Sequence, residues 1–199
     1  MCDKECKDTE EMGHDITEEA RKMLEAGNGL GAIALLTQAI AQGDGRRETL
    51  LLRARVFAAM GCAKEAEEDT DQCLSDREDE DACLLKAALR LGQDDTDAAI
   101  TYYNKVKEKN PQNAEACLGL SRTYAASHRL DLALAAMDEA LERLPDFAEG
   151  YKERGRIKFL LHDQAGAMED LKRALALSPE AAKEVEGHFT NLPTPDQMQ

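Results

Sequence analysis

The chain repeats one pattern of small and large side chains every 34 residues over most of its 199 residues. Five consecutive repeats align, at residues 13–46, 47–79, 80–113, 114–147 and 148–181, and the second is one residue shorter than the others. A repeat of this length cannot bury its apolar face alone, so neighbouring repeats must stack into one continuous core. The 34-residue period therefore predicts the architecture, a stack of repeats with one continuous core.

Small residues recur at three positions of each repeat, counted from its first residue. Position 8 holds Ala20, Ala54, Ala87, Ser121 and Gly155; position 20 holds Ala32, Ala66, Ala99, Ala133 and Ala167; position 27 holds Ala39, Cys73, Val106, Ala140 and Ala174. We expect two helices to touch closely at these positions, because small side chains let backbones approach.

Position 15, between the two halves of each repeat, holds Gly27, Gly61, Asp94, His128 and His162. These residue types tolerate a tight or left-handed turn better than β-branched residues do. On either side, alanine, leucine, glutamate and lysine recur at steps of three and four, and no stretch alternates as a strand would. The sequence therefore predicts an all-α chain in which each repeat is a helix, a turn and a second helix.

These positions resemble the tetratricopeptide repeat, which has a large residue at position 4, small ones at 8, 20 and 27, a bulky one at 24 and often proline at 32. The fifth repeat follows this pattern with Tyr151, Gly155, Ala167, Leu171, Ala174 and Pro179. The resemblance implies a right-handed superhelical solenoid over residues 13–181. Ser178 as an N-cap and Pro179 at the first helical position predict a capping helix at 179–189 that covers the last repeat. We expect residues 190–199 to be mobile, and residues 1–12 to be mobile or a short helical extension.

Position 7, which is usually leucine in this family, is Arg53 in the second repeat and Arg154 in the fifth. A charge near the seam between two helices needs a partner. Position 23 of the same two repeats is Asp69 and Asp170. We predict ion pairs from Arg53 to Asp69 and from Arg154 to Asp170, with a structural role.

The resemblance also implies that the first helices of successive repeats line a concave groove, with positions 2, 5, 9, 12 and 13 facing it. Steps of three and four do place positions 2, 5, 9 and 12 on one helical face. Position 9 is arginine in four repeats, and positions 5 and 12 supply large apolar residues. The predicted ligand-binding residues are Arg21, Arg55, Arg122, Arg156, Leu51, Leu84, Leu118 and Phe159.

The planar fork of arginine suits carboxylates, so the expected partner is another protein that offers an acidic segment, a free C-terminus or a helix. The alternative is that these arginines pair with acids of the chain itself. The acids at position 2 could reach them from neighbouring helices; they are Glu48, Asp81, Glu115 and Glu149. The basic and asparagine residues with which some family members grip chaperone tails are not matched, since Lys152 is the only base at position 5.

Composition and motifs exclude several other functions. The chain has 25 Lys and Arg against 40 Asp and Glu, a net charge of -15, which argues against nucleic acid as a partner. No apolar run approaches the ~18 residues that a membrane span needs. No HExxH, GxSxG or glycine-rich phosphate loop occurs, so we expect neither catalysis nor a cofactor. The polar, acidic first residues are unlike a secretory signal, and we expect a cytoplasmic protein.

Two further functions stay open at this point. Residues 64–81 contain ten acids and two bases, and this acidic outer face could serve a self-associating structural adaptor, a homo-oligomer. A thiol or metal sensor could use Cys2, Cys6 and His14 as soft ligands.

Overall fold

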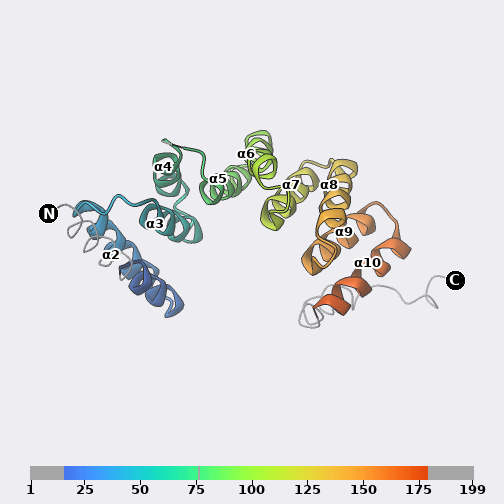
Figure 1. Ribbon diagram of the computed structural model, residues 1–199, viewed down its shortest axis with the longest axis horizontal. Coiled ribbons are helices and arrows are strands. Elements are labelled where there is room, and N and C mark those ends of the chain that lie inside the picture. The colour runs from blue at the N-terminus through green and yellow to red at the C-terminus, as the bar shows by residue number, and fades with distance from the viewer. Residues whose placement is uncertain (1–15, 76, 179–199) are drawn as a thin grey trace. The chain divides into compact units, whose positions relative to one another are not determined.

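The computed structural model describes residues 16–75 and 77–178, which form helices joined by short connections (Figure 1). Residues 16–25 are helical. The further helices are α2 (Gly29–Ala41), α3 (Arg47–Ala59), α4 (Ala63–Leu74), α5 (Glu80–Gly92), α6 (Thr96–Lys109), α7 (Ala114–Ala126), α8 (Leu130–Arg143), α9 (Ala148–Leu160) and α10 (Gln164–Leu177). The described residues contain no strand, so the all-α fold is confirmed. The expected terminal segments, 1–12, 179–189 and 190–199, lie outside the described residues.

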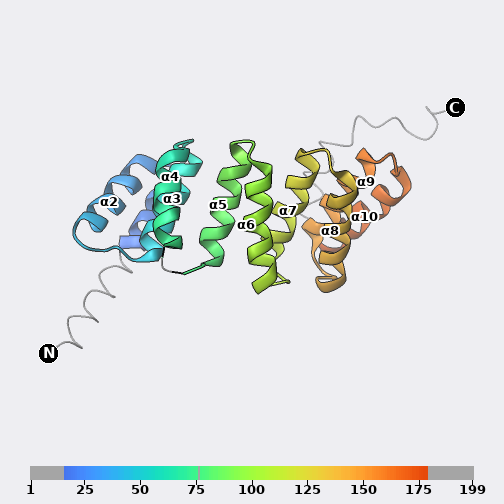
Figure 2. The ribbon, with the colours of Figure 1, turned by 90° about the horizontal axis from the view of Figure 1, so that it is seen from above.

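The helices belong to two compact units, unit 1 (Met1–Tyr102) and unit 2 (Tyr103–Gln199), divided within α6. In unit 1, α3 packs against both α2 and α4, and α4 packs against α5. In unit 2, α7 packs against α8, α8 against α9, and α9 against α10 (Figure 2). Within each unit, a helix therefore contacts its partner in the hairpin and a helix of the next repeat, as stacking requires.

Each helical hairpin turns at position 15. Gly27, Gly61, Asp94, His128 and His162 have φ angles of 76°, 77°, 61°, 58° and 66°. In every case the N–H of the next residue donates to a carbonyl five residues earlier, as from Cys62 to Phe57 and from Arg129 to Tyr124, each at 2.8 Å. This hydrogen bond is that of a Schellman turn, which requires the left-handed residue. The predicted turn is confirmed.

The residues at positions 8, 20 and 27 are buried in all five repeats. The two helices of a hairpin come so close that the hydroxyl of Ser121 donates to the backbone carbonyl of Ala133 at 3.1 Å. At the equivalent place in α9, a β-carbon on Gly155 would lie 3.1 Å from the carbonyl oxygen of Ala167. The space at position 8 therefore suits only small side chains, as the sequence predicts.

Both predicted ion pairs are confirmed. Arg53 donates Nε and Nη2 to the two carboxylate oxygens of Asp69, at 2.8 and 2.6 Å. Arg154 makes the same pair of bonds to Asp170, also at 2.8 and 2.6 Å. The two aspartates are buried, with 5% and 4% of the side chain exposed. Each two-point fork holds the two helices of its hairpin in one orientation.

The cation at position 7 also reaches the preceding repeat, which the sequence analysis did not anticipate. In three repeats it contacts the side chain at position 25 of the repeat before. The pairs are Arg53 with Thr37, Lys86 with Asp71, and Arg154 with Asp138, at N–O distances of 3.1, 2.8 and 2.8 Å. One cation therefore links a hairpin to its neighbour, and Lys86 does so with only 2% of its side chain exposed.

We predict that Asp170→Asn lowers the free energy of unfolding by about 2–4 kcal/mol near neutral pH, because it removes the carboxylate that Arg154 and Lys158 share. Burial alone would raise the pKa of Asp170, but hydrogen bonds from Arg154 and Lys158 outweigh burial and hold that pKa below its ordinary value. A lowered pKa in the folded state contributes stability above the unfolded pKa of about 3.9, and this contribution disappears as pH falls through the folded pKa. Urea unfolding should therefore show a difference between wild type and variant that shrinks below about pH 4. A difference that does not change with pH would contradict the assignment.

We also predict that Gly119→Ala lowers the free energy of unfolding by about 1–3 kcal/mol, since a β-carbon there would lie 2.2 Å from Cζ of buried Tyr103. Gly92→Ala is the matched control, because a β-carbon on this helical glycine would meet no described atom within 4 Å beyond its chain neighbours and the backbone of its own helix. The control should be neutral or stabilising by up to about 1 kcal/mol. Equal effects of the two substitutions in urea melts would show that Tyr103 does not need the space.

Candidate functional site

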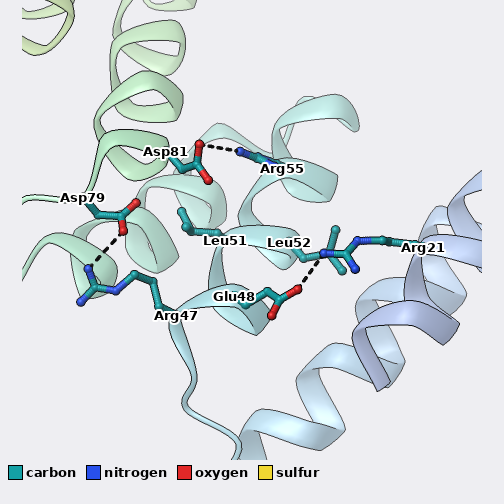
Figure 3. Close-up of a pocket in the computed structure, with 8 residues that line it drawn as sticks. All are labelled: Arg21, Arg47, Glu48, Leu51, Leu52, Arg55, Asp79 and Asp81. Carbon is teal, nitrogen blue, oxygen red and sulfur yellow. Dashed lines mark hydrogen bonds and ion pairs between the residues drawn. The ribbon is translucent and has the colours of Figure 1, made fainter. Parts of the chain in front are cut away.

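Three of the eight predicted binding residues, Arg21, Leu51 and Arg55, meet at a pocket of about 420 Å³ in unit 1 (Figure 3). The lining consists of Arg21, Arg47, Glu48, Leu51, Leu52, Arg55, Asp79 and Asp81. The pocket thus combines an apolar surface with three basic and three acidic side chains.

First helices of successive repeats supply this lining. Arg21 comes from the helix of residues 16–25, and five residues between 47 and 55 come from α3 at helical spacing. Asp79 and Asp81 stand at the start of α5. The carboxylate of Asp79 accepts a hydrogen bond from the backbone N–H of Ala82 at 3.0 Å, and this cap fixes where α5 begins.

The arginines at position 9 pair with acids at position 2 of the next repeat. The partners are Glu48 for Arg21, Asp81 for Arg55 and, in unit 2, Glu149 for Arg122, at N–O distances of 2.7, 3.5 and 3.1 Å. All six side chains are between 42% and 62% exposed. Exposed ion pairs of this kind contribute about 0–1 kcal/mol each. Three of the four acids that the sequence analysis weighed against ligand binding do reach an arginine, but they hold it weakly.

Arg156 pairs on its own helix instead. Its Nε and Nη2 donate to the two carboxylate oxygens of Glu153 at 3.2 and 2.5 Å, and these hydrogen bonds raise the pKa of the Arg156 guanidinium. Glu153 has only 6% of its side chain exposed and also lies 3.6 Å from Nε of Arg122. One buried glutamate therefore orients both position-9 arginines of unit 2.

The predicted apolar residues have different environments. Leu51 is buried and lines the pocket, whereas Leu84 is buried in α5 and is not part of the lining. In unit 2, Leu118 packs against the core that contains Cys117 and Met137. Phe159 is half-buried on α9. Leu51 is therefore the apolar residue of the predicted set that the structure brings together with position-9 arginines in a pocket.

The sequence analysis missed three residues of the lining, Arg47, Leu52 and Asp79. Arg47 and Leu52 occupy positions 1 and 6, outside the positions that the family resemblance assigns to the groove. Nη1 of Arg47 lies 3.5 Å from Oδ2 of Asp79 (Figure 3). An aspartate directly before the acidic first turn of a helix is a recognisable N-cap signal, and it could have placed Asp79 at this end of α5.

The acidic segment of residues 64–81 uses much of its charge inside unit 1. Five of its acids lie within 4.0 Å of cations on α3 or α5. The pairs are Glu67 with Lys86 and Arg90, Asp69 with Arg53, Asp71 with Lys86, Asp79 with Arg47, and Asp81 with Arg55. These acids join α4 and α5 to the neighbouring helices, which leaves less charge for an outside partner than the composition suggests.

Two of the described cysteines, Cys73 and Cys117, are poor candidates for thiol chemistry because they are buried. Burial raises the pKa of Cys73 to about 11, and burial also raises the pKa of Cys117. A thiol with a raised pKa stays protonated near neutral pH and reacts slowly. The residues invoked for a metal or thiol sensor, Cys2, Cys6 and His14, lie outside the described residues. Within residues 16–75 and 77–178, no three His, Cys, Asp or Glu side chains are grouped as a metal site would need.

None of the helices in the described part of the chain has the length and apolar character that crossing a bilayer requires.

The stacked helical hairpins and the pocket on their first helices define an all-α repeat protein. Residues 90–154 match the sequence model of the tetratricopeptide repeat family. The chain therefore contains tetratricopeptide repeats.

Several known proteins resemble the chain. Protein O-mannosyl-transferase TMTC1 of Homo sapiens is 28% identical over 158 residues, which cover 75% of this chain and 18% of the transferase. Hsc70-interacting protein 1 of Drosophila melanogaster is 36% identical over 92 residues, or 46% of this chain and 24% of that protein. The chain thus spans less than a quarter of each relative. The crystal structure of YrrB, described as a TPR protein with an unusual peptide-binding site, superposes with a TM-score of 0.62 at 18% identity, covering 87% of this chain and 90% of YrrB.

We predict that Arg55→Gln and Arg122→Gln each change the free energy of unfolding by less than about 1 kcal/mol. Their ion pairs with Asp81 and Glu149 are exposed, and the buried Glu153 beside Arg122 keeps its hydrogen bonds from Arg156. Arg53→Gln is the matched comparison, two residues away on the same helix but forked onto a buried carboxylate, and it should cost about 2–4 kcal/mol. Urea unfolding of the three variants checks this. If Arg55→Gln cost as much as Arg53→Gln, the position-9 arginines would be structural.

Proposed function

We propose that the chain is a noncatalytic protein-interaction module, which binds an acidic or C-terminal peptide or a helix of a partner protein on the first helices of its repeats. The observation that carries this proposal is that Arg21, Leu51 and Arg55 line one pocket, with both guanidiniums about half exposed. The corresponding surface of unit 2 has Arg122, Arg156, Leu118 and Phe159 as candidate contacts.

The chemistry of binding is an exchange of carboxylates. A ligand carboxylate takes the place of Glu48 or Asp81 on the guanidinium of an arginine. Breaking the exposed internal ion pair costs about 1 kcal/mol or less. The buried side chain of Leu51 and the partly exposed Leu52 offer apolar surface for a neighbouring side chain of the ligand. Affinity then depends on excluding water from the new ion pair.

The relatives support an interaction role by what their names state. One is described as interacting with Hsc70, and the structurally similar YrrB is described as having a peptide-binding site. Both descriptions belong to those proteins. They support the class of function proposed for this chain, and the partner is a separate question.

We predict that Arg55→Ala weakens the binding of acidic or free-carboxylate peptides about tenfold or more, since it removes an exposed fork from the pocket. Binding of a peptide library, varied in charge and in the state of the C-terminus, measures this for wild type and variant. Arg122→Ala, measured separately, tests unit 2.

Arg143→Ala is the control, because Arg143 forms an exposed ion pair with Glu139 on α8 and does not line the pocket. Unchanged affinity in Arg55→Ala and Arg122→Ala would remove the arginines from the proposal. Sedimentation over a range of concentrations would then test self-association as the remaining function.

A further inference from the structure

The pocket in unit 1 carries no net charge, although the chain as a whole carries -15. Its three arginines face three acids, with N–O distances of 2.7 Å for Arg21 and 3.5 Å for both Arg47 and Arg55. Figure 3 shows these pairs arranged around Leu51 and Leu52. A row of arginines predicts a basic surface, but the folded pocket offers both signs of charge next to an apolar surface.

A uniformly acidic ligand is poorly matched to this arrangement. When a ligand carboxylate takes Arg55 from Asp81, the displaced aspartate stays at the start of α5 and repels the ligand. The same holds for Glu48 beside Arg21. A ligand that also brings a cation neutralises the displaced acid, so ion pairs are exchanged without leaving a like-charge contact.

Arg47 gives an independent reason to expect that a ligand brings a hydrogen-bond acceptor to the unit 1 pocket. Its Nη1 is buried and has no hydrogen-bond acceptor among the described residues. Asp79 lies 3.5 Å away, and its carboxylate is held by the capping hydrogen bond from Ala82. Moving Asp79 onto Arg47 would release the start of α5, so a buried donor stays open beside the pocket. A carboxylate of a bound segment would satisfy it after the Arg47 side chain, 22% of which is exposed, turns toward the pocket.

We propose that the unit 1 pocket selects a segment of a partner protein in which acidic and basic side chains alternate around a leucine-like side chain. The acids of the segment pair with Arg47 and Arg55, a base pairs with Glu48 or Asp81, and the apolar side chain packs on Leu51 and Leu52. This inference rests on the proposed function and narrows its partner to a mixed-charge segment, with Arg47 as a specificity-determining residue.

The test uses the full chain and four fluorescent peptides of about ten residues, a length that spans roughly 33 Å when extended. All four have leucine at the same positions. The charged positions alternate glutamate and lysine in the first peptide, and are all glutamate, all lysine or all glutamine in the others. Fluorescence anisotropy at about 0.1 M salt gives the affinities without excessive screening.

We expect the alternating peptide to bind about tenfold or more tightly than the all-glutamate peptide, and Arg47→Gln to reduce that affinity about tenfold. Asp81→Asn should reduce the difference in affinity between these two peptides, because it weakens binding of the alternating peptide and strengthens binding of the all-glutamate peptide. Glu68→Gln removes the same charge from the exposed face of α4 and is the matched control, which should leave both affinities unchanged.

The outcomes separate this inference from the proposed function. If the all-glutamate peptide binds as well as the alternating one, the mixed-charge selection is overturned and the proposed function stands. Preference for the all-lysine peptide also overturns the selection. An alternating peptide that binds equally to wild type and Arg47→Gln overturns the role of Arg47. If none of the four binds, the proposed function and the inference fail together.

Discussion

The close contact between the two helices of each repeat is the constraint on which the other features depend. At position 8 the first helix meets the second so tightly that Ser121 reaches a backbone carbonyl and Gly155 has almost no room for a β-carbon. A larger side chain there would push the helices apart, because interiors are packed to near-crystalline density. The contact therefore fixes how each first helix is rotated, and with it which side chains face away from the hairpin.

Positions 7 and 9 lie on either side of this contact and have different roles. Successive residues of a helix point about 100° apart, so one neighbour of position 8 turns along the seam and the other turns out of it. Arg53, at position 7, has 16% of its side chain exposed and binds a buried aspartate, so its removal should lower the free energy of unfolding. Arg55, at position 9, is 55% exposed and 3.5 Å from its acid, so it can exchange partners. Burial separates a structural arginine from a candidate binding arginine two residues away.

Features within one repeat could be predicted from the sequence with residue-level detail. The left-handed turn follows from the residue types at position 15, and the pairing of Arg53 with Asp69 follows from two positions that face each other in one hairpin. The bonds from position 7 to the preceding repeat, such as Arg154 to Asp138, were not predicted, because they depend on how one hairpin stacks on the next. The pocket likewise depends on how one hairpin stacks on the next. Arg47 and Asp79 lie far apart in the sequence and meet where α3 and α5 come together.

The amino-acid pattern alone specifies a helical repeat chain, its hairpins and the row of arginines along the first helices, because these depend on spacing within about 34 residues. Whether those arginines form a basic surface depends on side chains contributed by the next repeat. The folded chain places Glu48 and Asp81 against Arg21 and Arg55, and the expected basic row becomes a neutral pocket of paired charges. Charge in the sequence is a sum over residues, whereas the charge that a ligand meets depends on which residues packing brings within a few ångströms of one another.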